Sequence, residues 1–265
     1  MWGIIPAAGR GTRIQPLAFS KELLPVGARS PHDAARPCAV AEYLVDRMLR
    51  GGADKLCFVI GEGKSDILDY FGGEFADVPI AYVVQAQPSG LCDAIFRARP
   101  LIGANDSVAI GLPDTVWFPD DALARLPEDM LSFLLFPVAQ PELFDAVLLD
   151  ECDCVREIRV KQDDPGTRWI WGAFKMPARV FTQLHTLWLA REKRDEYIGT
   201  LVNAWLQQGG LAIGVKAGES YMDVGTLAGY HAAINLLAAR DAPDADAQPF
   251  GNGHVNPVLV GENLR

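Results

Sequence analysis

One stretch near the amino terminus decides the fold: WGIIPAAGRGTR, residues 2–13. Its first five residues form a short apolar run, which is typical of a buried strand. The two glycines that follow allow a sharp turn and bring backbone N–H groups close to an anion. The stretch therefore predicts a strand that ends in an anion-binding loop, although the glycines alone fit an ordinary surface turn equally well.

Apolar runs and helical patterns alternate along the rest of the chain. Strands are predicted at residues 2–6, 56–60, 80–84, 107–112, 131–138, 146–149, 172–176 and 212–215. Helices are predicted from residue 40 to a stop at Gly51 and Gly52, and at 66–71, 91–98, 178–191, 197–208 and 227–240. Such alternation is typical of a sheet covered by helices on both faces, so the pattern predicts a three-layered α/β fold.

Length and composition limit the domain count and the classes of partner. The chain has 265 residues, of which 49% are hydrophobic and 22% are charged, enough for one large core. We expect one domain over residues 1–240 and an irregular carboxyl-terminal tail over 241–265, where helical periodicity stops. The net charge of −10 repels polyanions, so we expect neither nucleic acid nor an anionic membrane as a partner.

The cysteines and the hydrophobic segments indicate the compartment. Five scattered cysteines in a chain of this length favour a reduced, cytoplasmic setting over a disulfide framework. The amino terminus lacks the pattern of a secretory signal, and the longest strongly apolar stretch, residues 130–139, is too short to cross a bilayer. We therefore expect a cytoplasmic protein, and apolar residues on surface helices leave a homo-oligomer open.

Two cations follow the glycine loop, and two commoner phosphate motifs fail. Arg13 offers a planar fork of donors and Lys21 a compact charge, so the two can hold different oxygens of one polyphosphate. The dinucleotide motif needs a third glycine where this chain has Ile14. Residues 63–65 resemble the end of a P-loop, but Phe58 stands where its first glycine is required, so Lys64 is predicted to be a surface lysine.

The loop and the residues after it resemble a family signature. The pattern is Ala8-Gly9-x-Gly11-Thr12-Arg13-x-x-Pro16, followed by Lys21-x-x-Leu24-Pro25-Val26. It resembles the sugar-1-phosphate nucleotidylyltransferases, the family of glucose-1-phosphate thymidylyltransferase and UTP-glucose-1-phosphate uridylyltransferase. The resemblance implies a Rossmann-like nucleotidyltransferase fold with a mostly parallel central sheet. It also implies transfer of a nucleotidyl group from a nucleoside triphosphate, dTTP or UTP, to a sugar-1-phosphate, with release of pyrophosphate.

The resemblance assigns the nucleotide end of the site. It implies that Arg13 holds the leaving pyrophosphate and that Lys21 steadies the reacting phosphates. The nucleotide-binding residues that it implies are Ala8, Gly9, Gly11, Thr12, Gln87 and Gly90. A glutamine amide donates and accepts at once, which suits the edge of a pyrimidine base, but the same segment also fits a helix start capped by Ser89.

Two aspartates are candidate metal ligands. Asp114 follows the predicted strand 107–112, and the carboxyl ends of strands are where open α/β sheets place ligand chemistry. Asp223, in the segment 221–226, resembles the second metal-binding aspartate of the family. Either residue alone would fit a turn or a helix cap. Together with a substrate phosphate they favour Mg²⁺, which prefers hard oxygen ligands.

The sugar end carries both matches and departures. The resemblance implies sugar-phosphate contacts from Lys161, Gly172 and Glu196, although Glu196 also fits an exposed helix start. Val160 stands where the family has a glutamate, and Asp145 interrupts an aromatic-Gly-Val pattern. The sugar is therefore not fixed as glucose. Only four residues separate Pro16 from Lys21, a shorter interval than the family pattern has.

These departures leave two rival functions open. The chain is either an active enzyme or a catalytically weak relative that binds a nucleotide sugar and regulates a partner. A third reading is a CTP-dependent cytidylyltransferase that acts on another phosphate. Product formation separates the first two readings, and competition between UTP, dTTP and CTP separates the third.

Overall fold

The computed structural model describes residues 1–28 and 36–241, and every strand and helix predicted from the sequence is present. The strands are β1 Trp2–Ala7, β2 Pro25–Ala28, β3 Pro37–Ala39, β4 Lys55–Gly61, β5 Glu74–Phe75, β6 Val78–Gln85, β7 Ser107–Gly111, β8 Thr115–Phe118, β9 Leu131–Pro137, β10 Asp145–Leu149, β11 Val155–Val160, β12 Trp169–Pro177, β13 Ala212–Val215 and β14 Ser220–Asp223. The helices are α1 Val40–Arg50, α2 Ser65–Phe71, α3 Gly90–Arg97, α4 Ala178–Ala190, α5 Ile198–Gln207 and α6 Leu227–Asp241, with a short 3₁₀ helix η1 at Lys21–Leu23. The sequence patterns did not indicate β2, β3, β5, β8, β11 or β14. The predicted tail beyond Asp241 lies outside the described residues.

The centre of the sheet is parallel, as expected. Strands β7, β1, β4 and β6 lie side by side in this order, and each neighbouring pair runs parallel. Adjacent residues of β1 pack into different cores, with Ile4 on one face and Ile5 on the other. Side chains alternate between faces along a strand, so a fully apolar β1 is suited to the middle of a covered sheet.

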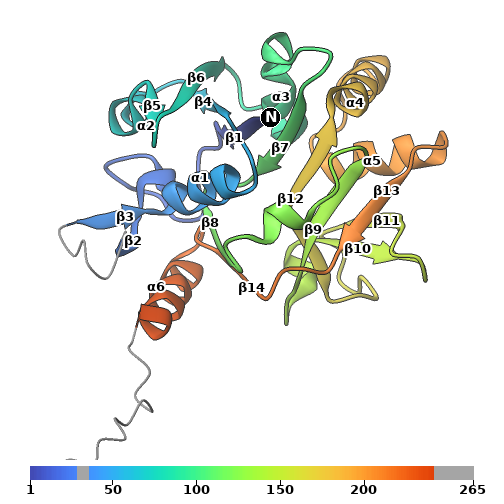
Figure 1. Ribbon diagram of the computed structural model, residues 1–265. Coiled ribbons are helices and arrows are strands. Elements are labelled where there is room, and N and C mark those ends of the chain that lie inside the picture. Colours follow the sequence, from blue (N-terminus) through green and yellow to red (C-terminus); the bar gives the residue numbers. More distant parts are fainter. Residues whose placement is uncertain (29–35, 242–265) are drawn as a thin grey trace, which may run out of the picture.

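The other half of the sheet is largely antiparallel. Strand β12 pairs antiparallel with β7, β9 and β10, and β10 pairs antiparallel with β11. Strand β13 adds to β9 in parallel. Figure 1 shows this half, in light green to orange, beside the parallel half, which runs from blue (β1) to green (β7). The outcome is a mixed sheet whose parallel strands carry the amino-terminal loop.

Helices cover both faces and make three layers. On one face, α1 and α2 contribute apolar residues to a core that contains Ile5 and Phe58. On the other face, α3, α4 and α5 pack over Ile4 and Val59. No described helix is long and apolar enough to cross a membrane.

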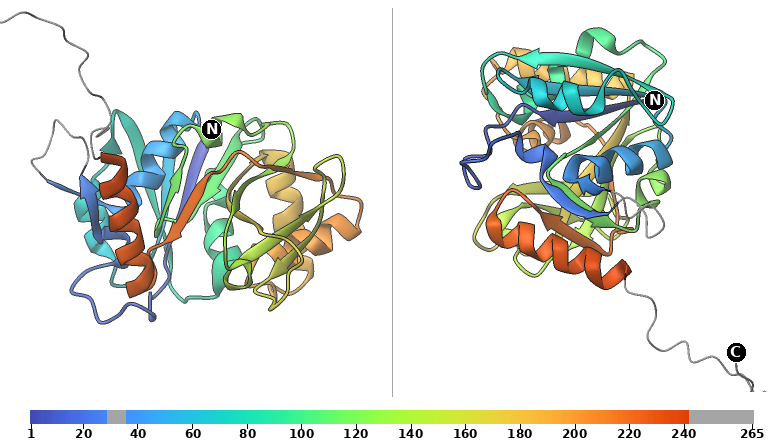
Figure 2. Two further views of the ribbon diagram at one scale, coloured as in Figure 1. Left: turned by 90° about the horizontal axis from the view of Figure 1, so that it is seen from below. Right: turned by 90° about the vertical axis from the view of Figure 1, so that its left-hand side faces the viewer.

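A third, smaller core joins the two ends of the described chain. Strands β8 and β14 form a two-stranded antiparallel sheet in which Thr115 is opposite Asp223. Helix α6 packs there through Ala233 and Leu237, which contact Val26 and other buried residues. Figure 2 shows α6, in red, alongside the blue amino-terminal segments. This packing carries residue 223 to the loop that follows β7.

Candidate active site

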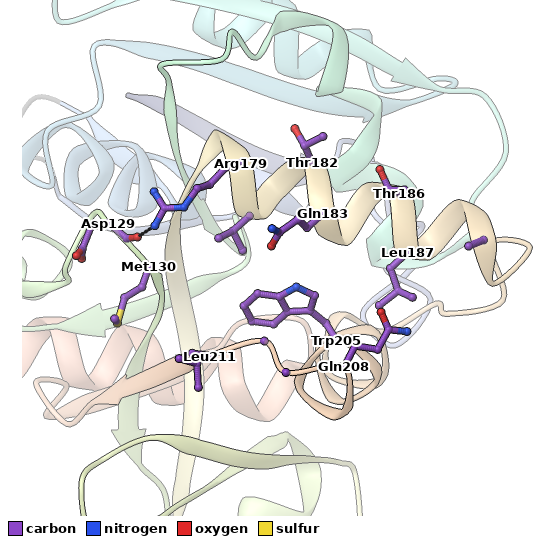
Figure 3. Close-up of a pocket in the computed structure, with 14 residues that line it drawn as sticks. Asp129, Met130, Arg179, Thr182, Gln183, Thr186, Leu187, Trp205, Gln208 and Leu211 are labelled. Atoms are coloured by element: carbon purple, nitrogen blue, oxygen red, sulfur yellow. Dashed lines mark hydrogen bonds between the residues drawn. The ribbon is translucent and has the colours of Figure 1, made fainter.

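A cleft of about 420 Å³ lies at the carboxyl ends of the parallel strands β1 and β7. Its charged lining residues come from distant parts of the sequence: Arg13, Lys21, Glu22, Asp114, Asp145, Lys161 and Asp223. A larger hollow of about 830 Å³ lies between α4 and α5, where Trp205 and Leu187 line it (Figure 3). That hollow contains none of the site residues predicted from the sequence, so the cleft is the candidate active site.

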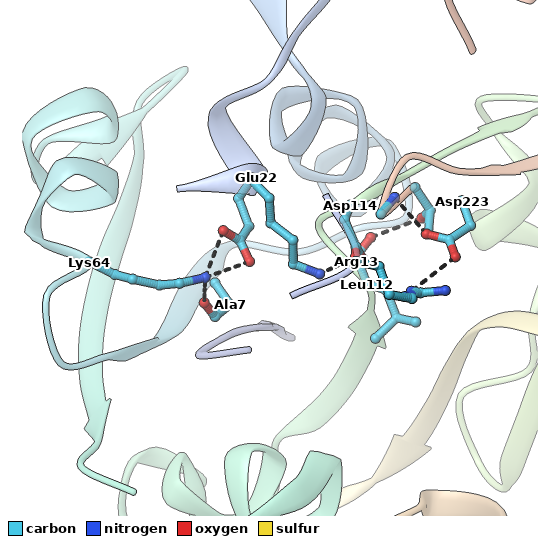
Figure 4. Close-up of polar contacts among 10 residues, drawn as sticks. Ala7, Arg13, Glu22, Lys64, Leu112, Asp114 and Asp223 are labelled. Atoms are coloured by element: carbon cyan, nitrogen blue, oxygen red, sulfur yellow. Dashed lines mark hydrogen bonds and ion pairs between the residues drawn. The ribbon is translucent and has the colours of Figure 1, made fainter. Parts of the chain in front are cut away.

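Two ion pairs bring the predicted cations and aspartates together in the cleft (Figure 4). The Lys21 ammonium pairs with the Asp114 carboxylate, and Arg13 Nη2 lies 3.2 Å from Asp223 Oδ2. The short interval after Pro16 therefore does not keep Lys21 out of the site. The backbone N–H of Val224 donates to the carbonyl of Asp114 over 2.8 Å, which fixes the two acidic segments side by side.

Burial and charge act against each other within this cluster. Burial of the Lys21 ammonium lowers its pKa, but the carboxylates of Asp114 and Glu22 outweigh burial and leave that pKa raised. Burial likewise disfavours the charged form of Asp114, but the Lys21 ammonium outweighs it and leaves the pKa of Asp114 lowered. Both groups are therefore charged at neutral pH, as a site for anions and cations requires.

Position 225 is closely surrounded by the two aspartates, and the Gly225 N–H donates to Asp223 Oδ1 over 2.8 Å. A Cβ atom added at Gly225 would lie 2.8 Å from Asp223 Oδ1 and 3.3 Å from Asp114 Oδ2. Within residues 1–28 and 36–241, no group of three or more His, Cys, Asp and Glu side chains could hold a metal ion. The carboxylates of Asp114 and Asp223 could hold a cation only together with water and substrate phosphate oxygens, as Mg²⁺ is often held.

The prediction that Lys64 is a surface lysine is wrong. Its side chain is only 12% exposed, and its ammonium lies 2.8 Å from Glu22 Oε2 and 2.7 Å from the carbonyl oxygen of Ala7 (Figure 4). Glu22 is buried, and burial raises its pKa although Lys64 and Lys21 both oppose this. Two opposite charges buried together satisfy each other, which a sequence pattern does not reveal.

A second contact anchors the same part of the loop. The hydroxyl and backbone N–H of Ser20 donate to Asp66, over 2.7 and 2.6 Å. Together with Lys64 and Glu22, this contact docks η1 against the start of α2. The position of Lys21 in the cleft is thus set by residues 64–66, which the family pattern does not include.

The residues of the glycine loop differ in their surroundings. Gly9 lines the cleft, Thr12 is exposed, and Ala8 is buried. Gly11 has a φ of +64°, and a Cβ there would lie 2.8 Å from Lys21 Cδ. Glycine is therefore needed at position 11 both for the backbone conformation and for the packing of Lys21.

The segment predicted to read the base lies beside the cleft. Gln87 is exposed, and the Ser89 hydroxyl donates to the Gln87 carbonyl over 3.3 Å rather than capping α3. Gly90 begins α3 with a φ of +91°, and a Cβ there would lie 2.7 Å from the backbone of Glu196. The buried Gln85, which the sequence analysis did not single out, donates to Asp93 over 2.7 Å and holds this helix start.

The three predicted sugar-phosphate residues are not all brought together. The Lys161 ammonium lies 4.8 Å above the ring of Tyr197, and both residues line the cleft. Gly172 is buried within β12, where a Cβ would lie 2.5 Å from Phe136. Glu196 is exposed and is not among the lining residues, and its backbone carbonyl accepts from Leu91 N–H at 2.8 Å and from Cys92 N–H at 3.2 Å. Their predicted contacts with a sugar stay predictions.

Asp145, Trp171 and Tyr197 line the cleft along with Lys161. Burial raises the pKa of Asp145 to about 6, although the Lys161 ammonium and the Trp171 indole both favour its charged form. Aromatic residues that line a cleft were not predicted as site residues. Their apolar character fits core packing equally well in a sequence, so only the fold distinguishes them.

Comparison with known proteins agrees with the fold and with the resemblance. A family model described as "Nucleotidyl transferase" matches residues 2–240. A glucose-1-phosphate thymidylyltransferase of Neisseria meningitidis is 28% identical over 247 residues, which cover 89% of this chain and 82% of the relative. A UTP–glucose-1-phosphate uridylyltransferase of Haloferax volcanii is 24% identical over 233 residues, 85% of this chain and 91% of the relative.

Solved structures show the same fold. A putative glucose-1-phosphate thymidylyltransferase from Bacillus anthracis superposes with a TM-score of 0.74 at 22% identity, covering 94% of this chain and 97% of that one. A UTP-bound UGPase from Acinetobacter baumannii gives a TM-score of 0.72 at 20% identity, covering 92% of this chain and 94% of that one. Because the family match extends over residues 2–240, this chain belongs to the nucleotidyl transferase family.

Proposed function

We propose that this enzyme transfers a nucleotidyl group from dTTP or UTP to a sugar-1-phosphate, giving a nucleoside-diphosphate sugar and pyrophosphate. The observation that carries the proposal is the convergence of Arg13, Lys21, Asp114 and Asp223 on one cleft. The names of the relatives from Neisseria meningitidis and Haloferax volcanii support the choice of base and of sugar phosphate.

The reaction needs no nucleophile from the protein. An oxygen of the sugar phosphate attacks the α-phosphorus in line, and the bond from that phosphorus to the bridging oxygen of the leaving pyrophosphate breaks. Catalysis then consists of positioning and charge stabilisation. Arg13 binds the departing pyrophosphate, and Lys21 binds oxygens of the α-phosphoryl group. Both cations exchange their aspartate partners for phosphate oxygens when the substrates bind.

We further propose that Asp114 and Asp223 hold Mg²⁺ with the substrate phosphates. The presence of both carboxylates in one cleft supports this assignment. Bound Mg²⁺ would neutralise charge on the two anionic reactants. Backbone N–H groups of the loop at residues 8–12 would bind the triphosphate, with Gly9 closest to the cleft.

A matrix of nucleotides against sugar-1-phosphates tests the proposal. Purified protein is incubated with each pair in the presence and absence of Mg²⁺, and pyrophosphate release and product mass are measured. We expect product with UTP or dTTP and with at least one sugar-1-phosphate, only when Mg²⁺ is present. Binding of a nucleotide sugar without turnover of any pair would instead support a regulatory role, and turnover with CTP alone would support a cytidylyltransferase.

A further inference from the structure

A carboxylate stands in the aromatic end of the cleft without a matching partner. Asp145 is half-buried at the start of β10, and Phe144, Trp171 and Tyr197 line the same end of the cleft. Within the described residues its carboxylate forms no ion pair within 4.0 Å, although Lys161 is close enough to act on it through charge. Acidic side chains are seldom buried in apolar surroundings without a partner or a function.

An unsatisfied donor accompanies this acceptor. The indole of Trp171 is only 6% exposed, and its N–H comes near enough to Asp145 to favour the charged carboxylate. Yet this buried N–H completes no hydrogen bond with any acceptor in the part of the chain that the structure describes. The indole N–H is shielded from the cleft, so the Asp145 carboxylate, which lines the cleft, is the group left for a ligand with hydrogen-bond donors. Sugar hydroxyls are such donors.

The strand register explains how this carboxylate reaches the site. Asp145 of β10 is paired directly with Val160 of β11. Directly opposed residues of antiparallel strands place their side chains on the same face. The two departures from the family pattern, an added acid at 145 and a missing acid at 160, therefore occupy one cross-strand position. On that face Val160 lies against the start of α5, where a Cβ added at Gly199 would be 2.8 Å from Val160 Cγ2.

Lys161, the residue that follows β11, lines the cleft. Lys161 has a φ of +47°, which side-chain-bearing residues adopt only when the surroundings enforce it. Its backbone N–H donates to the carbonyl of Phe144 over 3.1 Å, which locks the residue beside Asp145. A cation and a carboxylate thus stand next to each other at one end of the cleft, which matches a ligand with a phosphate and hydroxyls on one ring.

We propose that Asp145 is a specificity-determining residue that accepts hydrogen bonds from hydroxyl groups of the sugar ring. This inference rests on the proposed sugar-1-phosphate activity. Asp145 supplies from β10 the carboxylate that Val160 cannot supply from β11, while Lys161 binds the phosphate of the same sugar. A sugar phosphate without the matching hydroxyls leaves the Asp145 carboxylate unsatisfied and is discriminated against.

The first test separates sugar binding from nucleotide binding. Asp145→Asn and Asp145→Ala are compared with wild type and with Asp163→Asn, a matched control in which an exposed carboxylate outside the cleft is removed. The KM for the preferred sugar-1-phosphate should rise about 10- to 100-fold in both Asp145 variants, the usual range for hydrogen bonds to a charged group. The KM for the nucleotide and all parameters of Asp163→Asn should stay within about two-fold of wild type.

The second test identifies the hydroxyl through a cycle with deoxy analogues. For wild type, removing one particular hydroxyl from the sugar-1-phosphate should reduce kcat/KM by the same factor as the Asp145→Ala substitution does with the intact sugar. Asp145→Ala should show no further loss on that analogue. Equal losses in wild type and Asp145→Ala on every analogue would overturn the inference, as would an unchanged sugar KM. A KM for the nucleotide that rises in step with the sugar KM would also overturn it, since a general defect has this effect. If wild type turns over no pair at all, the proposed function itself fails.

Discussion

Replacing Gly225 with alanine should strongly reduce turnover while leaving the fold intact. Gly225 is buried between the two acidic segments, and its backbone lies outside the left-handed region, so alanine meets no conformational penalty. The new Cβ would lie 2.8 Å from Asp223 Oδ1, 3.0 Å from Arg13 Nη2 and 3.3 Å from Asp114 Oδ2. The methyl group therefore presses on both carboxylates and on Arg13, the groups that are proposed to bind Mg²⁺ and pyrophosphate.

The magnitude follows from these distances. Ordinary contact begins at 3.4 Å, so a 2.8 Å approach forces Asp223 Oδ1 to retreat by about 0.6 Å (3.4 less 2.8). Metal–oxygen distances tolerate only about 0.2 Å, and a misplacement of about 1 Å can reduce the rate about 100-fold. We expect a loss of that order in kcat. The Arg13 side chain is 64% exposed and can move aside, so the free energy of unfolding should change by less than about 1 kcal/mol.

Turnover and thermal unfolding are measured on Gly225→Ala, wild type and Gly73→Ala. The last is a matched control, because a Cβ at Gly73 meets nothing within 4 Å and the residue lies far from the cleft in sequence. The loss of activity should persist at saturating Mg²⁺. Wild-type turnover by Gly225→Ala, with a normal dependence on Mg²⁺, would refute the placement of the metal between the two aspartates.

Three further predictions use other parts of the site. Lys64→Met should destabilise the protein by about 3 kcal/mol, because it leaves the Glu22 carboxylate buried and unpaired; an unchanged urea midpoint would contradict this. Lys21→Ala and Asp223→Asn should each lose about 100- to 1000-fold in turnover with unchanged circular dichroism, and either variant at wild-type rate would remove its residue from the mechanism. Asp145→Asn should raise the melting temperature of the substrate-free protein. The pKa of Asp145 is raised by burial from 3.8 to about 6, so the folded state binds more protons than the unfolded state between these values. The charged carboxylate is therefore a cost to stability above about pH 6, and the gain from Asn should shrink as the pH falls from 6 toward 4. A gain that does not depend on pH would show that the charge of Asp145 is not its cause.

The sequence was sufficient for most of the architecture. Short apolar runs such as Leu56–Ile60 and Leu131–Val138 favour buried strands, and the alternation with helices left few topologies open. Strands β8 and β14 escaped prediction because their segments have no clear period of two. They exist because they pair with each other across more than a hundred residues. That long-range pairing, and no local signal, brings Asp223 to Asp114.

The sequence predicted the site residues that belong to a motif. It missed the residues whose role depends on being buried in the fold. Arg13, Lys21, Asp114 and Asp223 carry a pattern, and they meet as expected. Lys64 was misread because a lysine in a polar segment is usually exposed, and its partner Glu22 lies 42 positions away. The cross-strand position of Asp145 depends on a register that shifts between Leu148 and Leu149, which no periodicity reveals.

The two ion pairs of the cleft determine which charged ligands bind well to the substrate-free protein. Lys21 is already matched by Asp114, and Arg13 by Asp223, so neither a bare triphosphate nor a lone divalent ion gains the full attraction of its counterpart. A metal–nucleotide chelate carries both signs of charge and exchanges partners with both pairs in one event. We therefore expect the metal-free triphosphate and the free divalent ion to compete only weakly with the chelate for the cleft. Simple polyanions should bind weakly for the same reason.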